Sequence, residues 1–136
     1  MKSTNLKVLI LEDMYYRAGQ YKDRLAPLGI TDITHITNAR ECIENLKKIK
    51  YDLVSLDYHL DQAESYRLTE DNKGTTVVQW IKDHPEKVKK SMLIIIHSCS
   101  EKGALEMKTL LPNAHVIRKA WHKDVFGEVA KILKLK

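Results

Sequence analysis

Residues 8–13, with the sequence VLILED, place two acidic residues directly after a run of aliphatic ones. An unbroken aliphatic run predicts a strand that is buried on both faces, as in the middle of a parallel sheet. We predict this strand over 6–11. Similar runs at 53–56 and 92–96 predict two more buried strands.

Two further strands complete the predicted sheet. Residues 30–36 alternate between isoleucine and polar residues, which favours an edge strand, and 115–117 form a short apolar run. Helical patterns lie between the strands. The first covers about 15–26 and ends at Pro27, and Asn38 is suited to capping the second.

The remaining helical patterns follow the third and fourth strands. One runs from about Thr75 to Lys82, Ser100 is suited to capping the next with Leu105 facing inward, and a last one lies near the carboxyl end. Alternating strands and helices predict an α/β domain over residues 1–136, with a five-stranded parallel sheet and helices on both faces. The functional site of such a sheet lies at the carboxyl ends of its strands.

Composition narrows the class of protein. The formal net charge is +5, but many of the lysines fall where helices are predicted to end, where cations are expected, so we do not expect a nucleic-acid partner. No apolar run is long enough to span a bilayer, and Cys42 and Cys99 have no metal-ligand spacing. We expect a cytoplasmic protein without a membrane partner.

The strand ends carry the chemistry. Glu12 and Asp13 follow the first strand, Asp57 the third, Ser98 the fourth and Lys119 the fifth. Three carboxylates at one place require a cation, and oxygen ligands suit Mg²⁺. Taken singly, each acid could be an ordinary loop residue, and Asp13 could cap the next helix. Their occurrence together at successive strand ends favours a site.

This arrangement resembles the receiver domain of two-component signalling over nearly the whole chain. The resemblance implies a flavodoxin-like, doubly wound sheet with the strand order 2-1-3-4-5. It also implies that Asp57 is a phosphoacceptor and that Glu12 and Asp13 hold Mg²⁺ with Asp57 and the backbone carbonyl of His59. Ser98 would sense the phosphoryl group, and Lys119 would pair with it.

Other residues depart from that pattern. Val116 stands where receivers carry a switch aromatic, and a long polar stretch occupies residues 58–73. A second resemblance is to a divergent family of cyclic-phosphate-processing receivers. Its motifs match Leu56-Asp57-Tyr58-His59-Leu60 in part, followed by Gly74, Val78-Gln79-Trp80-Ile81 and His97-Ser98. His59 and His97 are the acid–base candidates that this second resemblance implies.

Two hypotheses follow. The one we favour is a stand-alone receiver that a sensor histidine kinase or a small phosphodonor phosphorylates on Asp57, and that signals by docking a downstream protein. The alternative is a phosphoesterase acting on cyclic phosphates, with the same acidic pocket and His97 or His59 as catalytic groups. Side chains alternate along a regular strand, so His97 and Ser98 would point to opposite faces, which counts against the enzyme.

Overall fold

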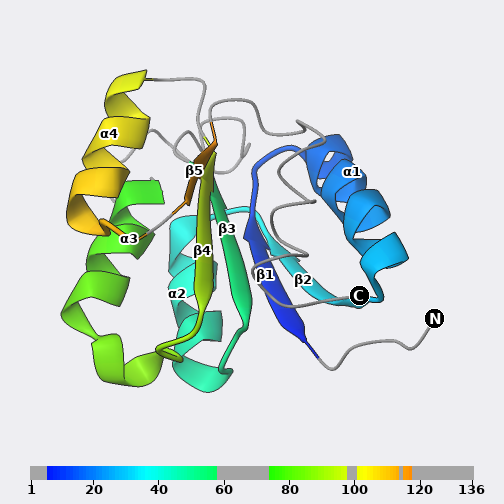
Figure 1. Ribbon diagram of the computed structural model, residues 1–136, viewed down its shortest axis with the longest axis horizontal. Coiled ribbons are helices and arrows are strands. Elements are labelled where there is room, and N and C mark those ends of the chain that lie inside the picture. The colour runs from blue at the N-terminus through cyan, green and yellow to red at the C-terminus, as the bar shows by residue number, and fades with distance from the viewer. Residues whose placement is uncertain (1–5, 58–73, 98–100, 114, 118–136) are drawn as a thin grey trace.

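The computed structural model describes residues 6–57, 74–97, 101–113 and 115–117. Five strands form a parallel sheet in the order β2-β1-β3-β4-β5, which confirms the predicted topology (Figure 1). The strands are β1 (Lys7–Leu11), β2 (Asp32–Ile36), β3 (Leu53–Asp57), β4 (Leu93–His97) and β5 (His115–Ile117). The alternating strand β2 lies at an edge, as its pattern predicted.

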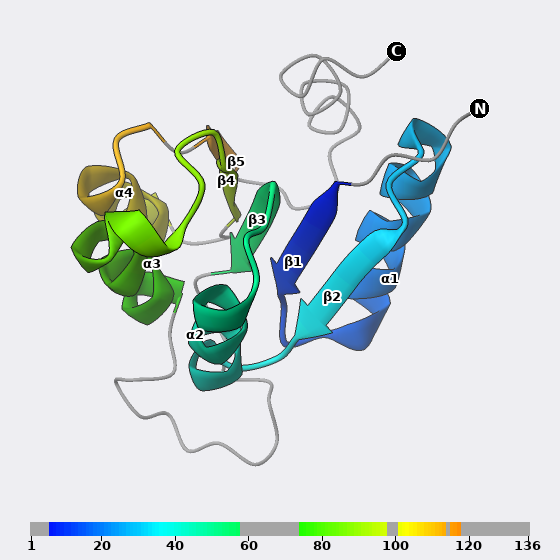
Figure 2. The same ribbon diagram turned by 90° about the horizontal axis from the view of Figure 1, so that it is seen from below.

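Helices cover both faces of this sheet, as expected. The α-helices are α1 (Tyr15–Leu25), α2 (Ala39–Lys48), α3 (Gly74–Asp83) and α4 (Glu101–Leu110). Two short 3-10 helices are η1 (Ala26–Leu28) and η2 (Pro85–Lys87). Helix α1 lies on one face, and α2, α3 and α4 lie on the other (Figures 1 and 2). The helix expected near the carboxyl end lies outside the described residues.

Two separate apolar cores explain why the central strands read as unbroken aliphatic runs. Along β1, Val8 and Ile10 pack into the cluster that includes Leu25 of α1, whereas Leu9 and Leu11 pack into the cluster under α2 and α3. Successive side chains of a strand point to opposite faces, and here both faces are covered. Burial on both faces therefore requires an apolar residue at every position.

Helix ends follow the predicted chemistry in part. The Asn38 side chain accepts a hydrogen bond from the backbone N–H of Glu41 (3.0 Å), which confirms it as the cap of α2. The inward placement of Leu105 is wrong, because its side chain is 66% exposed. Helix α4 instead turns Gly103 and Met107 inward, one helical turn apart. Ser100 lies outside the described residues.

Strand register sets the level at which the functional side chains meet. Leu11 of β1 pairs with Leu56 of β3, and Asp57 pairs with His97 of β4. The residues that end these three strands therefore lie side by side at one edge of the sheet. In the described part of the chain, none of the helices is both long enough and apolar enough to cross a bilayer.

Candidate phosphoryl and metal site

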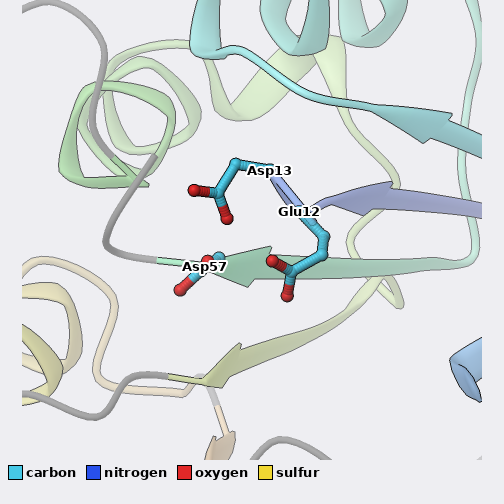
Figure 3. Close-up of side chains that lie close together, drawn as sticks. All are labelled: Glu12, Asp13 and Asp57. Carbon is cyan, nitrogen blue, oxygen red and sulfur yellow. The ribbon is translucent and has the colours of Figure 1, made fainter. Parts of the chain in front are cut away.

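Three carboxylates meet at the carboxyl ends of β1 and β3. One oxygen each from Glu12, Asp13 and Asp57 lies within 4.8 Å of the other two. The side chains gather around one space just beyond the strand ends (Figure 3). All three residues are buried, with exposed fractions of 0%, 7% and 5%. The convergence predicted from the strand ends is therefore present in the fold.

Burial makes this cluster electrostatically costly. Loss of hydration raises the pKa of Glu12 to about 9, and the charge of Asp57 and a hydrogen bond with Asp13 act in the same direction. The backbone N–H of Met14 donates to Oε2 of Glu12 (3.1 Å), which opposes the shift only in part. Without a compensating cation, Glu12 is therefore protonated at neutral pH.

The donor set fits a hard divalent cation. Oε1 of Glu12 is shielded from solvent and has no hydrogen-bond partner within the described residues, so a buried acceptor is left over. Oxygens around an octahedral Mg²⁺ lie about 3 Å apart when adjacent and about 4 Å apart when opposite. The oxygens within 4.8 Å need only a small inward movement to reach that geometry. Glu12, Asp13 and Asp57 could thus hold Mg²⁺.

The edge strand holds the connection between β1 and α1 in place. The backbone N–H of Glu12 donates to the carbonyl of Ile36 (3.0 Å), and Nε2 of His35 donates to the carbonyl of Glu12 (2.7 Å). The ring of Tyr15 meets the His35 ring edge-on, at 5.2 Å between centroids. Sequence reasoning missed His35, because a histidine in an alternating strand carries no distinctive pattern.

Helix α1 begins after the acidic pair without using it as a cap. The N-cap position is Met14, and no side chain of the described residues caps that helix end. The alternative in which Asp13 serves only as a helix cap is therefore wrong. Its carboxylate lies in the cluster with Glu12 and Asp57.

Helix α1 also brings an arginine and a tyrosine toward the carboxylates. Burial lowers the pKa of Arg17, but a hydrogen bond with Tyr16 and the negative charges of Glu12 and Asp57 outweigh it and raise that pKa. Burial, with the same two charges, raises the pKa of Tyr21. The sequence analysis did not identify Arg17. The available signal was its position one helical turn before Tyr21, a residue of the buried stripe.

The other predicted site residues are placed only in part. His97 ends β4, and its backbone pairs with that of Asp57. His59, Ser98 and Lys119 lie outside the described residues, as does the polar stretch 58–73. Val116 lies in β5.

Solved structures show the same fold. A CheY-like response regulator receiver domain from Methylobacillus flagellatus is 18% identical, with a TM-score of 0.71 over 95% of this chain and 99% of that one. A two-component response regulator from Clostridium difficile is 20% identical, with a TM-score of 0.72 over 96% and 97%. A response regulator from Burkholderia pseudomallei with a phosphorylated aspartic acid, calcium ion and citrate is 15% identical, with a TM-score of 0.68 over 94% and 66%.

Sequence comparison identifies the family. The identities of 18%, 20% and 15% with these three solved structures show a common fold and nothing finer. No protein with a curated function is recognisably similar in sequence. The family model described as the cyclic-phosphate processing receiver domain matches residues 8–113, which include both strands that carry the carboxylates. The chain therefore belongs to the family of cyclic-phosphate processing receiver domains.

Proposed function

We propose that this protein is a phosphorylation-dependent signalling switch in which Asp57 accepts a phosphoryl group with Mg²⁺ bound. The observation that carries the proposal is the meeting of Asp57 with Glu12 and Asp13 in one buried cluster. Three carboxylates that are buried together favour a bound cation, and Mg²⁺ would fill that role. The Burkholderia pseudomallei relative with a phosphorylated aspartic acid and a calcium ion supports this assignment by analogy.

The proposed reaction is a phosphoryl transfer to a carboxylate. An oxygen of Asp57 attacks the phosphorus of a phosphodonor in line, a new P–O bond forms, and the donor's leaving group departs with the electrons of the broken bond. Glu12, Asp13 and the backbone carbonyl of His59 would hold Mg²⁺ with Asp57. Bound Mg²⁺ would offset negative charge on the phosphoryl oxygens. Lys119 would pair with the phosphoryl group and Ser98 would bond to one of its oxygens.

Output would come from docking of a downstream protein by a single domain over residues 1–136. We place this docking on the outer surface of α4, where Leu105 is 66% exposed. A sensor histidine kinase or a small phosphodonor would supply the phosphoryl group.

Mass spectrometry of the intact protein tests the switch. The protein is incubated with acetyl phosphate and Mg²⁺, and a parallel sample contains a chelator. We expect the addition of one labile phosphoryl group only when Mg²⁺ is present. The absence of any addition, or an equal addition with the chelator, would contradict the proposal.

The family description supports a second candidate function, the processing of cyclic phosphates. One structural observation also favours it, because the backbone of His97 lies directly beside that of Asp57. In this alternative a water molecule would attack the phosphorus of a cyclic phosphate ester, and His97 or His59 would protonate the ring oxygen that leaves as its bond to phosphorus breaks.

A direct assay separates the two functions. A nucleoside 2′,3′-cyclic phosphate is incubated with Mg²⁺ and either the wild-type protein or His97→Ala. The switch predicts no turnover by either protein. Turnover by the wild type that disappears in His97→Ala would establish the enzyme instead.

A further inference from the structure

Two members of the carboxylate cluster, Glu12 and Asp57, face α1, because alternation along their strands sends them to that side. Val8 and Ile10 pack in the core beside α1. Glu12 comes two residues after Ile10, just past the end of β1, so its side chain points to the same face. In β3, Leu53 packs in the same core, and Asp57, four residues later, points to the same face. Helix α1 covers one face of the sheet (Figure 2). By this alternation, Glu12 and Asp57 stand on that face.

Arg17 is the residue by which α1 meets this cluster. It lies one helical turn before Tyr21, which is only 2% exposed and packs against the sheet. Arg17 itself is partly buried, and its Nε atom is shielded from solvent. The charges of Glu12 and Asp57 both act on its guanidinium. Arg17 therefore lies on the side of α1 that faces the sheet, within electrostatic range of Glu12 and Asp57.

We propose that Arg17 is an anion-binding residue of the site, whose guanidinium binds phosphate oxygens held at the carboxylate cluster. The proposal rests on the proposed function, because it assigns a ligand group for the phosphoryl or phosphate ester that binds there. A guanidinium group presents two parallel N–H donors in one plane, which match two oxygens of a phosphate. An ammonium group lacks this planar arrangement. The phosphate could belong to phosphorylated Asp57 or to a bound ester, and the chemistry of recognition is the same.

The positive charge of Arg17 should have opposite effects on the affinities for Mg²⁺ and for phosphate. A guanidinium beside the carboxylates repels Mg²⁺ but attracts phosphate, so Arg17→Gln should bind Mg²⁺ more tightly than the wild type. The same variant should bind inorganic phosphate, with Mg²⁺ saturating, about tenfold more weakly because a charge-assisted hydrogen bond is lost. If Arg17 only supported the fold, its replacement would weaken the binding of both Mg²⁺ and phosphate.

Isothermal titration calorimetry measures both affinities in the full chain. Arg17→Lys keeps the charge and should restore the Mg²⁺ affinity of the wild type, but phosphate affinity only in part. Lys22→Gln is the matched control, since it removes one positive charge from an exposed position of the same helix, and it should change neither affinity. Weaker binding of both ligands by Arg17→Gln, or phosphate binding equal to that of the wild type, would overturn the proposal.

Two further measurements identify which phosphate Arg17 serves. Slower labelling of Arg17→Gln by acetyl phosphate would assign it to the phosphoryl group on Asp57. Weaker binding of a nucleoside 2′,3′-cyclic phosphate to Arg17→Gln in an Asp57→Asn background would assign it to an ester. Absence of labelling in the wild type would remove the switch, yet the affinities for Mg²⁺ and inorganic phosphate would still decide the role of Arg17.

Discussion

Gly74, the first residue of α3, lies against Asp57 so closely that a side chain cannot fit between them. A Cβ atom built on Gly74 would overlap the backbone carbonyl of Asp57 and would lie 2.9 Å from the terminal methyl group of Met107. The start of α3 is thereby fixed against the strand end that carries the proposed phosphoacceptor. The glycine provides the space for this close packing.

Replacement of Gly74 tests that packing. Gly74→Ala should destabilise the protein by about 1–3 kcal/mol, because backbone atoms must move to admit the methyl group. It should also slow phosphorylation, since Asp57 is displaced with its carbonyl. Gly19→Ala in α1 is the matched control, because nothing lies within 4 Å of its added Cβ.

The control should change stability in the other direction. Alanine is the better helix former, so Gly19→Ala should stabilise the protein by about 0.5–1 kcal/mol. Urea denaturation measures both variants. Equal stability of Gly74→Ala and the wild type would show that the two segments do not need to lie so close.

Asp13 provides the test of metal binding. Asp13→Asn removes one charged ligand and should weaken Mg²⁺ binding about tenfold or more in calorimetry. In the presence of a chelator, the same change should stabilise the protein, because it removes a negative charge that repels the charge of Asp57 in the metal-free cluster. Asp23→Asn makes the same charge change at an exposed position of α1. The metal site is refuted if Asp13→Asn and Asp23→Asn bind Mg²⁺ as well as the wild type.

The raised pKa of Glu12 predicts how stability depends on pH. Glu12 ionises near its ordinary value of 4.5 in the unfolded chain but at about 9 in the fold. Between these values the folded state holds the extra proton, so the free energy of unfolding falls as pH rises when no metal is present. Mg²⁺ should flatten this dependence, because it binds the ionised carboxylate.

The Glu12→Gln variant isolates this contribution from other titrating groups. The difference in unfolding free energy between Glu12→Gln and the wild type should grow with pH through that window in the presence of a chelator. Chemical denaturation at a series of pH values measures it. A difference that stays constant with pH would show that Glu12 ionises normally in the fold.

Sequence patterns predicted most of the fold, because the physical causes are local. The unbroken run in β1 reflects burial on two faces, and the alternation in β2 reflects its edge position. The prediction failed where periodicity was weak. Helix α4 has only a short apolar stripe, and its small residue Gly103 turns inward in place of Leu105.

The acidic site was predictable because it follows from strand ends alone. The pair Glu12-Asp13 follows one largely aliphatic strand and Asp57 follows another, and parallel strands bring such ends together. Arg17 and His35 were not predictable in the same way. Their roles depend on which helix covers which face and which strand is the neighbour, and that is a property of the tertiary fold.

Intact-mass measurement of three proteins tests most directly whether Asp57 is phosphorylated. The wild type, Asp57→Asn and Asp83→Asn are each incubated with acetyl phosphate and Mg²⁺. Asp83 ends α3, at the opposite end of that helix from Gly74, where its carboxylate accepts a hydrogen bond from Gln79. We predict one added phosphoryl group on the wild type and on Asp83→Asn, and none on Asp57→Asn. Labelling of Asp57→Asn to the level of the wild type would show that Asp57 is not the phosphoacceptor.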